Sequence, residues 1–173
     1  MSKKRASTTV PADRTQFVRA ASAAGLSSTP GLGALDGKHR SSIGRASKSV
    51  ARITASVDVD ASFNKEEPCA TRWDYGIGLL HGAGRESALW VEPHTSCSPS
   101  EVKVMLAKLD WLKAKLETPE FAGLKLLTAA SIHCGHEPFV WIATSTIAIR
   151  SGSREARQLA LAGLKPPVRR LNI

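Results

Sequence analysis

The chain has little of what builds secreted or membrane-spanning proteins. Its three cysteines, Cys69, Cys97 and Cys134, are odd in number and form no close pair, which argues against a disulfide framework and favours reduced thiols. The longest uncharged apolar run, Phe139 to Ile149, is well short of the roughly 20 residues of a membrane span. No apolar run of the signal-peptide type follows the first charges. We therefore expect a cytoplasmic protein that does not enter a membrane.

Acidic residues are scarce near the N-terminus. Residues 1–52 hold ten of the 24 basic side chains but two of the 15 acidic ones, so they carry +8 of the formal charge of +9. Residues 1–42 are rich in Ser, Thr, Ala, Gly and Pro with Phe17 as their one aromatic residue, and such a segment buries too little to offset the entropy of ordering it. We predict a basic arm over 1–42 that is disordered or only locally helical, and one domain over 43–173. The same composition also suits an organelle transit peptide.

The chain also lacks internal repeats, and its 173 residues with 42% hydrophobic content suffice for one domain with a real core. Two strand-like runs, Arg72 to Leu80 and Ser87 to Thr95, are separated by a segment with two glycines, which predicts a hairpin. Ser98-Pro99-Ser100-Glu101 is a capping box with proline at the first helical position. The helix that follows is predicted to end near Glu117 to Pro119 and to bury one face, formed by Val102, Met105, Leu106, Leu109, Leu112 and Leu116.

The remaining segments are read from weaker patterns. We favour a helix within residues 45–66, although residues 52–60 also alternate as a strand does. Residues 121–130 can pair as a strand, and Phe139 to Ser145 has the aromatic and β-branched content of a buried strand, with Thr146 to Arg150 as a partner strand. Ser153 can cap a helix over Arg154 to Ala162 that ends at Gly163. This order predicts an α/β or α+β fold, a small mixed sheet flanked by helices.

One pair of strands carries residues that suggest a chemistry. Trp73-Asp74-Tyr75-Gly76-Ile77 lies on the first strand of the hairpin and Leu89-Trp90-Val91-Glu92-Pro93-His94 on the second, and an amphipathic helix follows. This arrangement resembles the core of the PD-(D/E)XK nuclease-like superfamily, which carries an Asp near the start of one strand and an acid-x-Lys on its neighbour. The resemblance implies a restriction-endonuclease-like core and a protein that binds nucleic acid, either a Mg²⁺-dependent nuclease or an inactive relative.

The resemblance also implies roles for particular residues. Asp74 and Glu92 would hold Mg²⁺, because carboxylates on adjacent strands can share a hard divalent cation that activates water and stabilises charge on phosphate. His94 stands where the family has lysine, so it would assist catalysis in its place, or Lys103 or Lys108 on the next helix would reach the site as a substitute. In the arm, Lys3, Lys4 and Arg5 would bind phosphate chains together with Lys103 and Lys108, or the arm would serve only as a solubilising tail.

Other interpretations remain open. Asp74 can instead cap a turn or pair with Arg72 or a lysine, while Glu92 is a solvated strand residue. The protein would then be a non-catalytic protein-interaction module of a larger complex, such as a defence-related one, or a homo-oligomer. His133, Cys134 and His136 are potential zinc ligands. The alternative interpretation is that they belong to a polar loop before the strand that begins at Phe139.

Two further side-chain types invite a functional reading. Cys97 near a helix N-terminus can be an activated thiol or a small capping residue. Most of the tryptophans should pack in the core. Trp111, beside the lysines of the predicted helix, should be partly exposed.

Overall fold

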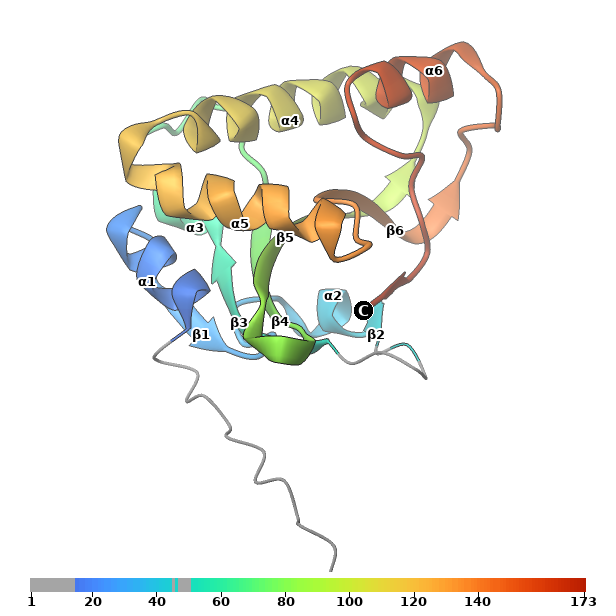
Figure 1. Cartoon of the computed structure of the whole chain (residues 1–173). Helices are drawn as coiled ribbons and strands as arrows, with labels where there is room; N and C mark the ends of the chain where they lie inside the picture. Colours follow the sequence, from blue (N-terminus) through green and yellow to red (C-terminus); the bar gives the residue numbers. More distant parts are fainter. Residues whose placement is uncertain (1–14, 45, 47–50) are drawn as a thin grey trace, which may run out of the picture.

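The computed structural model describes residues 15–44, 46 and 51–173 (Figure 1). The helices are α1 (Gln16–Ala23), α2 (Gly37–Arg40), α3 (Val59–Phe63), α4 (Val102–Leu116), α5 (Ala122–His133) and α6 (Arg154–Leu161), and the short 3₁₀ turns are η2 (Gly82–Gly84), η3 (Pro99–Glu101) and η4 (Pro119–Phe121). The strands are β1 (Ser28–Pro30), β2 (Ile43–Gly44), β3 (Arg52–Asp58), β4 (Tyr75–Leu80), β5 (Glu86–Cys97), β6 (Phe139–Ile147) and β7 (Leu171–Asn172). The fold is mixed α/β, as predicted.

A five-stranded mixed sheet organises the molecule, in the order β1-β3-β4-β5-β6. The first four strands pair antiparallel, whereas β6 runs parallel to β5 after the crossover through α4 and α5. The β4–β5 pair is the predicted hairpin, with Tyr75 opposite Val91 and Leu80 opposite Glu86. A separate parallel pair joins β2 to β7 near the C-terminus.

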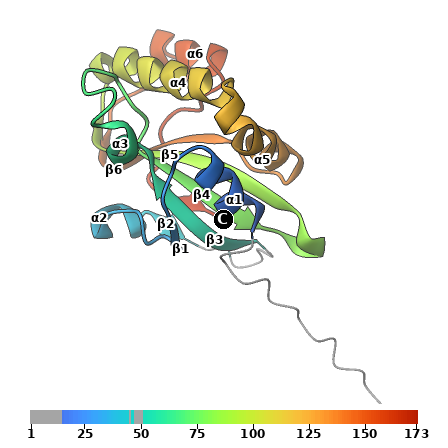
Figure 2. The ribbon, with the colours of Figure 1, turned by 90° about the vertical axis from the view of Figure 1, so that its left-hand side faces the viewer.

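Both faces of this sheet are covered (Figure 2). Along β5, Ala88 and Trp90 belong to the core under α1, α4 and α5, whereas Leu89 and Val91 belong to a second core on the opposite face, which Leu35 also joins. Side chains of a strand alternate between the faces, so residues 90, 92 and 94 lie on the face covered by α4 and α5, where the indole of Trp90 donates to Thr128 of α5. This alternation places the side chains of Glu92 and His94 on the helical side of the sheet, where the candidate site lies.

Residues 15–42 are not a disordered arm; the local helix that the prediction allowed is present as α1, and it is packed into the domain. Thr15 caps α1 by accepting a hydrogen bond from the backbone of Val18, and Phe17 is 0% exposed in the core. Gly78 of β4 makes room for this ring, since a Cβ there would lie 2.4 Å from a ring carbon of Phe17. The boundary at residue 42 is therefore misplaced, because this segment also supplies strand β1 to the sheet. Residues 1–14, with Lys3, Lys4 and Arg5, lie outside the described residues.

Two other elements differ from the prediction. Within 45–66 the main element is strand β3, and the helix is only the short α3, because β3 lies between β1 and β4 and is buried from Thr54 to Val57. Residues 122–133 form helix α5 rather than a strand. The residues of α5 that become buried, Leu124, Leu127, Thr128 and Ser131, recur at helical spacing, whereas Leu126 is 74% exposed.

The two helices that the capping residues predict are confirmed. The capping box at Ser98 starts η3 and then α4, and Ser153 caps α6, which gives way to Gly163 at a positive φ of 77°. Strand β6 is present but continues through Thr146, so the predicted separate partner strand does not form. No helix among the described residues has the length and apolar character needed to cross a bilayer.

Candidate functional site

Asp74 and Glu92 meet at the open end of the β4–β5 hairpin. The strand register places Tyr75 opposite Val91, so the next pair along brings Asp74 to Glu92. The backbone N–H of Asp74 donates to Oε2 of Glu92 over 2.8 Å. The predicted proximity of the two carboxylates is therefore present, across eighteen positions of sequence.

Helix α4 supplies a cation to this pair. The ammonium of Lys108 donates to Oδ1 of Asp74 at 2.9 Å and also to Oε1 of Glu92. The helix is anchored on the sheet by Met105 and Leu109, which are fully buried, and this packing holds the stem of Lys108 over the hairpin. Of the two lysines considered as substitutes for the family's lysine, Lys108 therefore reaches the carboxylates, whereas Lys103 is exposed on another face of α4.

His94 lies between two carboxylates. Its Nε2 is 3.0 Å from Oε1 of Glu92, and its Nδ1 is 3.7 Å from Oε1 of Glu101, the glutamate of the capping box. The hydrogen bond with Glu92 outweighs partial burial and raises the pKa of His94. The imidazolium form is thus favoured, so His94 keeps part of the positive charge that the family's lysine has at this position.

Burial controls the ionisation of Glu92. The side chain is 0% exposed, and desolvation raises its pKa to about 7, with the charge of Asp74 acting in the same direction and the bonds from His94 and Lys108 opposing it. For Lys108, desolvation alone would lower the pKa, but the charges of Glu92 and Asp74 outweigh it and the net shift is upward. Near neutral pH the Glu92–His94 pair therefore holds an exchangeable proton beside a permanent cation.

This ionisation predicts a pH dependence of stability. Folded Glu92 binds its proton more tightly than in the unfolded chain, where the pKa is near its ordinary value of 4.5, so the folded state holds more protons between about pH 4.5 and 7. The contribution of Glu92 to the unfolding free energy therefore falls by up to about 3 kcal/mol as pH rises through this window. Urea unfolding at several pH values should show this loss in the wild type relative to Glu92→Gln. Parallel pH profiles for the two proteins would contradict it.

Further polar groups surround the site that the sequence did not single out. Asp58 ends β3 next to Tyr75 and caps α3, and burial, then the charges of Asp60 and Asp74, raise its pKa. His39 of α2 lies with its Nδ1 3.3 Å from the hydroxyl of Tyr75. The position of Asp58 at the end of a neighbouring strand is a usable signal, but the pattern within residues 45–66 favours a helix and hides it.

The structural alternative for Asp74 and Glu92 is partly contradicted. Arg72 pairs with Asp60 at 2.8 Å, so Asp74 is left to a lysine, as that alternative allowed. Glu92, however, is not a solvated strand residue, because all of its side chain is buried. Burying a carboxylate raises the free energy of the folded state unless the group is paired and hydrogen-bonded. Glu92 therefore depends on its partners at this point of the hairpin.

The cysteine and zinc alternatives find no support. Cys97 is fully buried, and burial raises the pKa of its thiol to about 12, the opposite of an activated nucleophile. His133 is exposed, and Cys134 and His136 are half-buried. Within residues 15–44, 46 and 51–173, no three His, Cys, Asp or Glu side chains form a group that could hold a metal ion.

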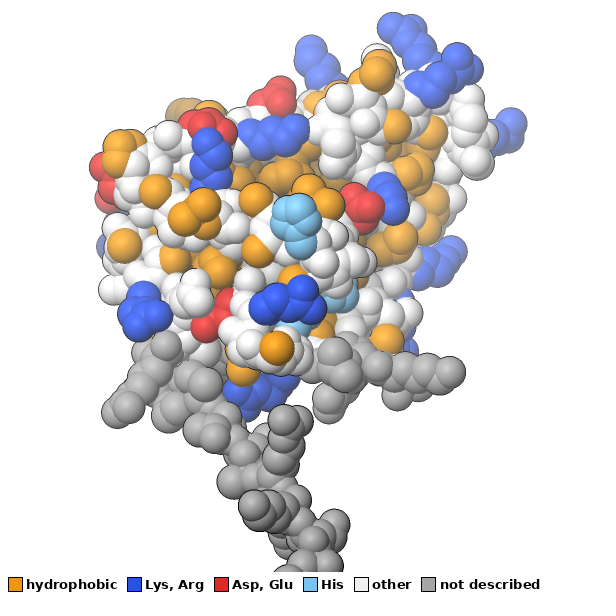
Figure 3. All heavy atoms as spheres, viewed as in Figure 1, with side chains coloured by type: hydrophobic (Ala, Val, Ile, Leu, Met, Phe, Trp, Pro, Cys, Tyr) orange, Lys and Arg blue, Asp and Glu red, His pale blue; other side chains and the backbone are white. Residues whose placement is uncertain are grey.

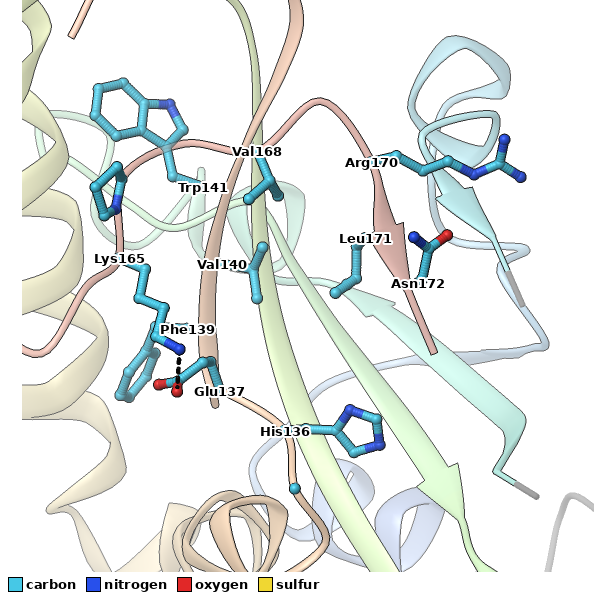
Figure 4. Close-up of a pocket in the computed structure, with 12 residues that line it drawn as sticks. His136, Glu137, Phe139, Val140, Trp141, Lys165, Val168, Arg170, Leu171 and Asn172 are labelled. Atoms are coloured by element: carbon cyan, nitrogen blue, oxygen red, sulfur yellow. Dashed lines mark ion pairs between the residues drawn. The ribbon is translucent and has the colours of Figure 1, made fainter. Parts of the chain in front are cut away.

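Two surface features lie apart from the Asp74–Glu92 pair. A cavity of about 220 Å³ runs along β6, lined in part by Phe139, Trp141 and Val168 (Figure 4). On its rim, Lys165 forms an ion pair of 2.8 Å with Glu137. Trp111 is half-buried, as predicted, and its indole N–H donates to Glu67. Neither feature adds a reactive group to the site.

Comparison with protein-family models, with curated proteins and with solved structures found no match to this chain. The candidate site therefore rests on the geometry of four side chains, Asp74, Glu92, His94 and Lys108. These side chains come from the β4–β5 hairpin and α4, the elements on which the resemblance to the PD-(D/E)XK superfamily was based.

Proposed function

We propose that this protein binds nucleic acid and cleaves its phosphodiester bonds at Asp74 and Glu92 with a divalent metal ion. The observation that carries the proposal is the convergence of Oδ1 of Asp74 and Oε1 of Glu92 on a single cationic group, the Lys108 ammonium. The resemblance implies two acids and a lysine. Here His94 occupies the lysine position, and Lys108 of the helix is the lysine that contacts both acids.

The residues present fit a Mg²⁺ ion held in part by its substrate. Mg²⁺ commonly takes one or two protein carboxylates and completes its coordination with water and phosphate oxygens, so the two oxygens that converge here suffice. When bound, such an ion would activate a water molecule and stabilise negative charge on the phosphate. It would share Asp74 and Glu92 with Lys108 or displace the ammonium from them.

The chain's own cations then have a place beside the reacting phosphate. Lys108 is held beside the two carboxylates by α4, so its ammonium would also be within reach of a phosphate oxygen there. His94 is 3.0 Å from Glu92 and 23% exposed, so it is the member of the proton-holding pair that a substrate can approach. With a raised pKa it can donate a proton to a departing oxygen near neutral pH.

A non-catalytic interaction module is the second candidate, and one observation favours it. The four side chains already satisfy one another, and together they fasten α4 to the β4–β5 hairpin. In that case the network is a structural clamp, and no metal binds to Asp74 and Glu92.

Melting temperature with added metal separates the two candidates. An ion that binds only the folded protein stabilises it by about 2.7 kcal/mol at a concentration one hundred times its dissociation constant, so Mn²⁺ or Mg²⁺ should raise the melting temperature of the wild type. The rise should vanish in Asp74→Asn/Glu92→Gln and persist in Glu66→Gln/Glu120→Gln, a control that neutralises two exposed acids. The interaction module predicts that metal leaves the wild type and both variants alike.

We also propose a reducing compartment such as the cytoplasm as the place of action. The three cysteines are free thiols: Cys97 is buried, Cys134 is half-buried and Cys69 is exposed. Disulfides are rare in that compartment, so an exposed thiol such as Cys69 can persist there.

A further inference from the structure

Charge within residues 53–173 is divided between two regions. Residues 53–147 contain eight basic and twelve acidic side chains, a formal charge of −4. Residues 148–173 contain six basic side chains and one acidic one, Glu155, a formal charge of +5. The near-neutral sum of this part of the chain therefore conceals a strongly basic end.

The basic end forms a surface on and around α6. Arg150, Arg154 and Arg157 are all exposed, and they lie on the loop before α6 and on its first turns. Lys103 of α4 and Arg154 line the same groove between the two helices, which Asp110 and Glu155 also line. In Figure 3 basic side chains gather at the upper right, over α6 and the loop that precedes it.

This surface extends toward the candidate site. Arg169 is exposed, and its guanidinium donates to the backbone carbonyl of Ser145 at the end of β6. The neighbouring Thr144 donates from its hydroxyl to the backbone carbonyl of His94 over 3.2 Å. Arg169 therefore contacts β6, the strand next to His94. The chain continues from the end of β6 to Arg150.

We propose that Lys103, Arg150, Arg154, Arg157 and Arg169, the C-terminal basic surface, bind the sugar-phosphate backbone of a nucleic acid and lead it toward Asp74 and Glu92. This inference rests on the proposed function for the identity of the ligand. Four of the five cations are arginines, whose planar guanidinium matches phosphate oxygens in a bidentate way. No hydrogen bond or ion pair joins the guanidinium of Arg150 or of Arg154 to another described residue, so these two side chains can turn toward a phosphate.

The acidic middle of the chain gives the surface a second effect. Within residues 53–173, a polyanion is repelled by residues 53–147 taken together and attracted by the C-terminal basic surface, so of these two regions it favours the side of α6. Contacts to phosphates carry no sequence information. The surface should therefore bind single strands and duplexes of many sequences, with affinity that falls steeply with salt.

The test is the salt dependence of binding in Arg150→Gln/Arg154→Gln/Arg157→Gln. Fluorescence anisotropy with labelled single-stranded and duplex DNA and RNA, in EDTA, should show at least tenfold weaker binding than the wild type at about 50 mM salt. The slope of log affinity against log salt should become shallower by about three, roughly one for each lost phosphate contact. Arg19→Gln/Arg85→Gln/Lys125→Gln is the matched control, because it removes the same charge from exposed positions on α1, the hairpin turn and α5.

Three results would overturn the inference: unchanged binding in the first variant, an equal loss in both variants, or binding of polyglutamate by the wild type as tight as that of DNA. The proposed function fails separately. Asp74→Asn/Glu92→Gln should lose cleavage and the metal-dependent rise in melting temperature while it keeps full binding. Arg150→Gln/Arg154→Gln/Arg157→Gln should keep the rise in melting temperature while it loses binding.

Discussion

Glu92→Ala should abolish nucleic-acid cleavage while leaving salt-sensitive binding intact. The variant removes one of the two carboxylates that converge on the proposed metal position, and loss of such a ligand removes several kcal/mol of charge stabilisation. We expect a rate at least about a thousandfold lower, which corresponds to about 4 kcal/mol. Cleavage under single-turnover conditions and anisotropy in EDTA measure the two properties separately.

Glu92→Gln is the necessary companion variant. Its side chain has the same shape and can still accept the hydrogen bond from the backbone N–H of Asp74, so it tests charge in a fold that is kept close to native. It should lose cleavage to a similar extent, whereas Glu120→Gln, at an exposed position, should cleave as the wild type does. Cleavage by both Glu92 variants at the wild-type rate would refute the assignment.

Lys108→Met should lower the free energy of unfolding far more than Lys103→Met does. It keeps the apolar stem on α4 but leaves Asp74 and the fully buried Glu92 without their shared cation. Breaking a buried ion pair by removing one partner typically costs about 3–5 kcal/mol, and we expect about 3 kcal/mol because Lys108 is 16% exposed. Urea unfolding measures this loss, and Lys103→Met, on the exposed side of the same helix, should change stability by less than about 0.5 kcal/mol.

The same variant reports on metal binding. Without the ammonium, Mn²⁺ no longer has a competitor at Asp74 and Glu92, so it should stabilise Lys108→Met more than it stabilises the wild type. Cleavage should nevertheless fall, because the cation beside the phosphate is gone. Equal stabilisation of both proteins by Mn²⁺ would show that the lysine and the metal do not share a position.

Local signals with a defined geometry were read correctly from the sequence. The capping box at Ser98, the repeat of apolar residues along α4 and the glycines of the hairpin turn each restrict the backbone within a few residues. The proximity of Asp74 and Glu92 follows from the hairpin, since its register can bring their positions together. Lys108 could be named only as one of two candidates, because the rotation of α4 on the sheet depends on long-range packing of residues such as Met105.

Elements held by tertiary contacts differ from the sequence prediction. Helix α1 has few large apolar residues, and its stability comes from burying Phe17 against Gly78, a contact between residues far apart in sequence. In 122–133 the leucines alone suggested a strand, but the polar Thr128 and Ser131 complete the buried helical face. Their hydroxyls donate hydrogen bonds to backbone carbonyls of the previous turn of the helix. These bonds offset the cost of burying the hydroxyl groups in the core.

Burial of charge was the least predictable property of the site. An alternating strand with Glu92 among apolar residues is compatible with either a solvated or a buried carboxylate. Burial in the folded protein removes the side chain from water and raises its pKa to about 7. The pairing of His94 with Glu101 is equally hidden, because Glu101 is recognisable in the sequence only as a capping residue.

The central claim is tested most directly by incubating the protein with single-stranded and duplex DNA and RNA in Mg²⁺, in Mn²⁺ and in EDTA, beside Asp74→Ala/Glu92→Ala. We predict cleavage of at least one substrate by the wild type with metal, none in EDTA, and none by the double variant under any condition. Absence of cleavage by the wild type across the panel, or equal cleavage by the double variant, would contradict the claim.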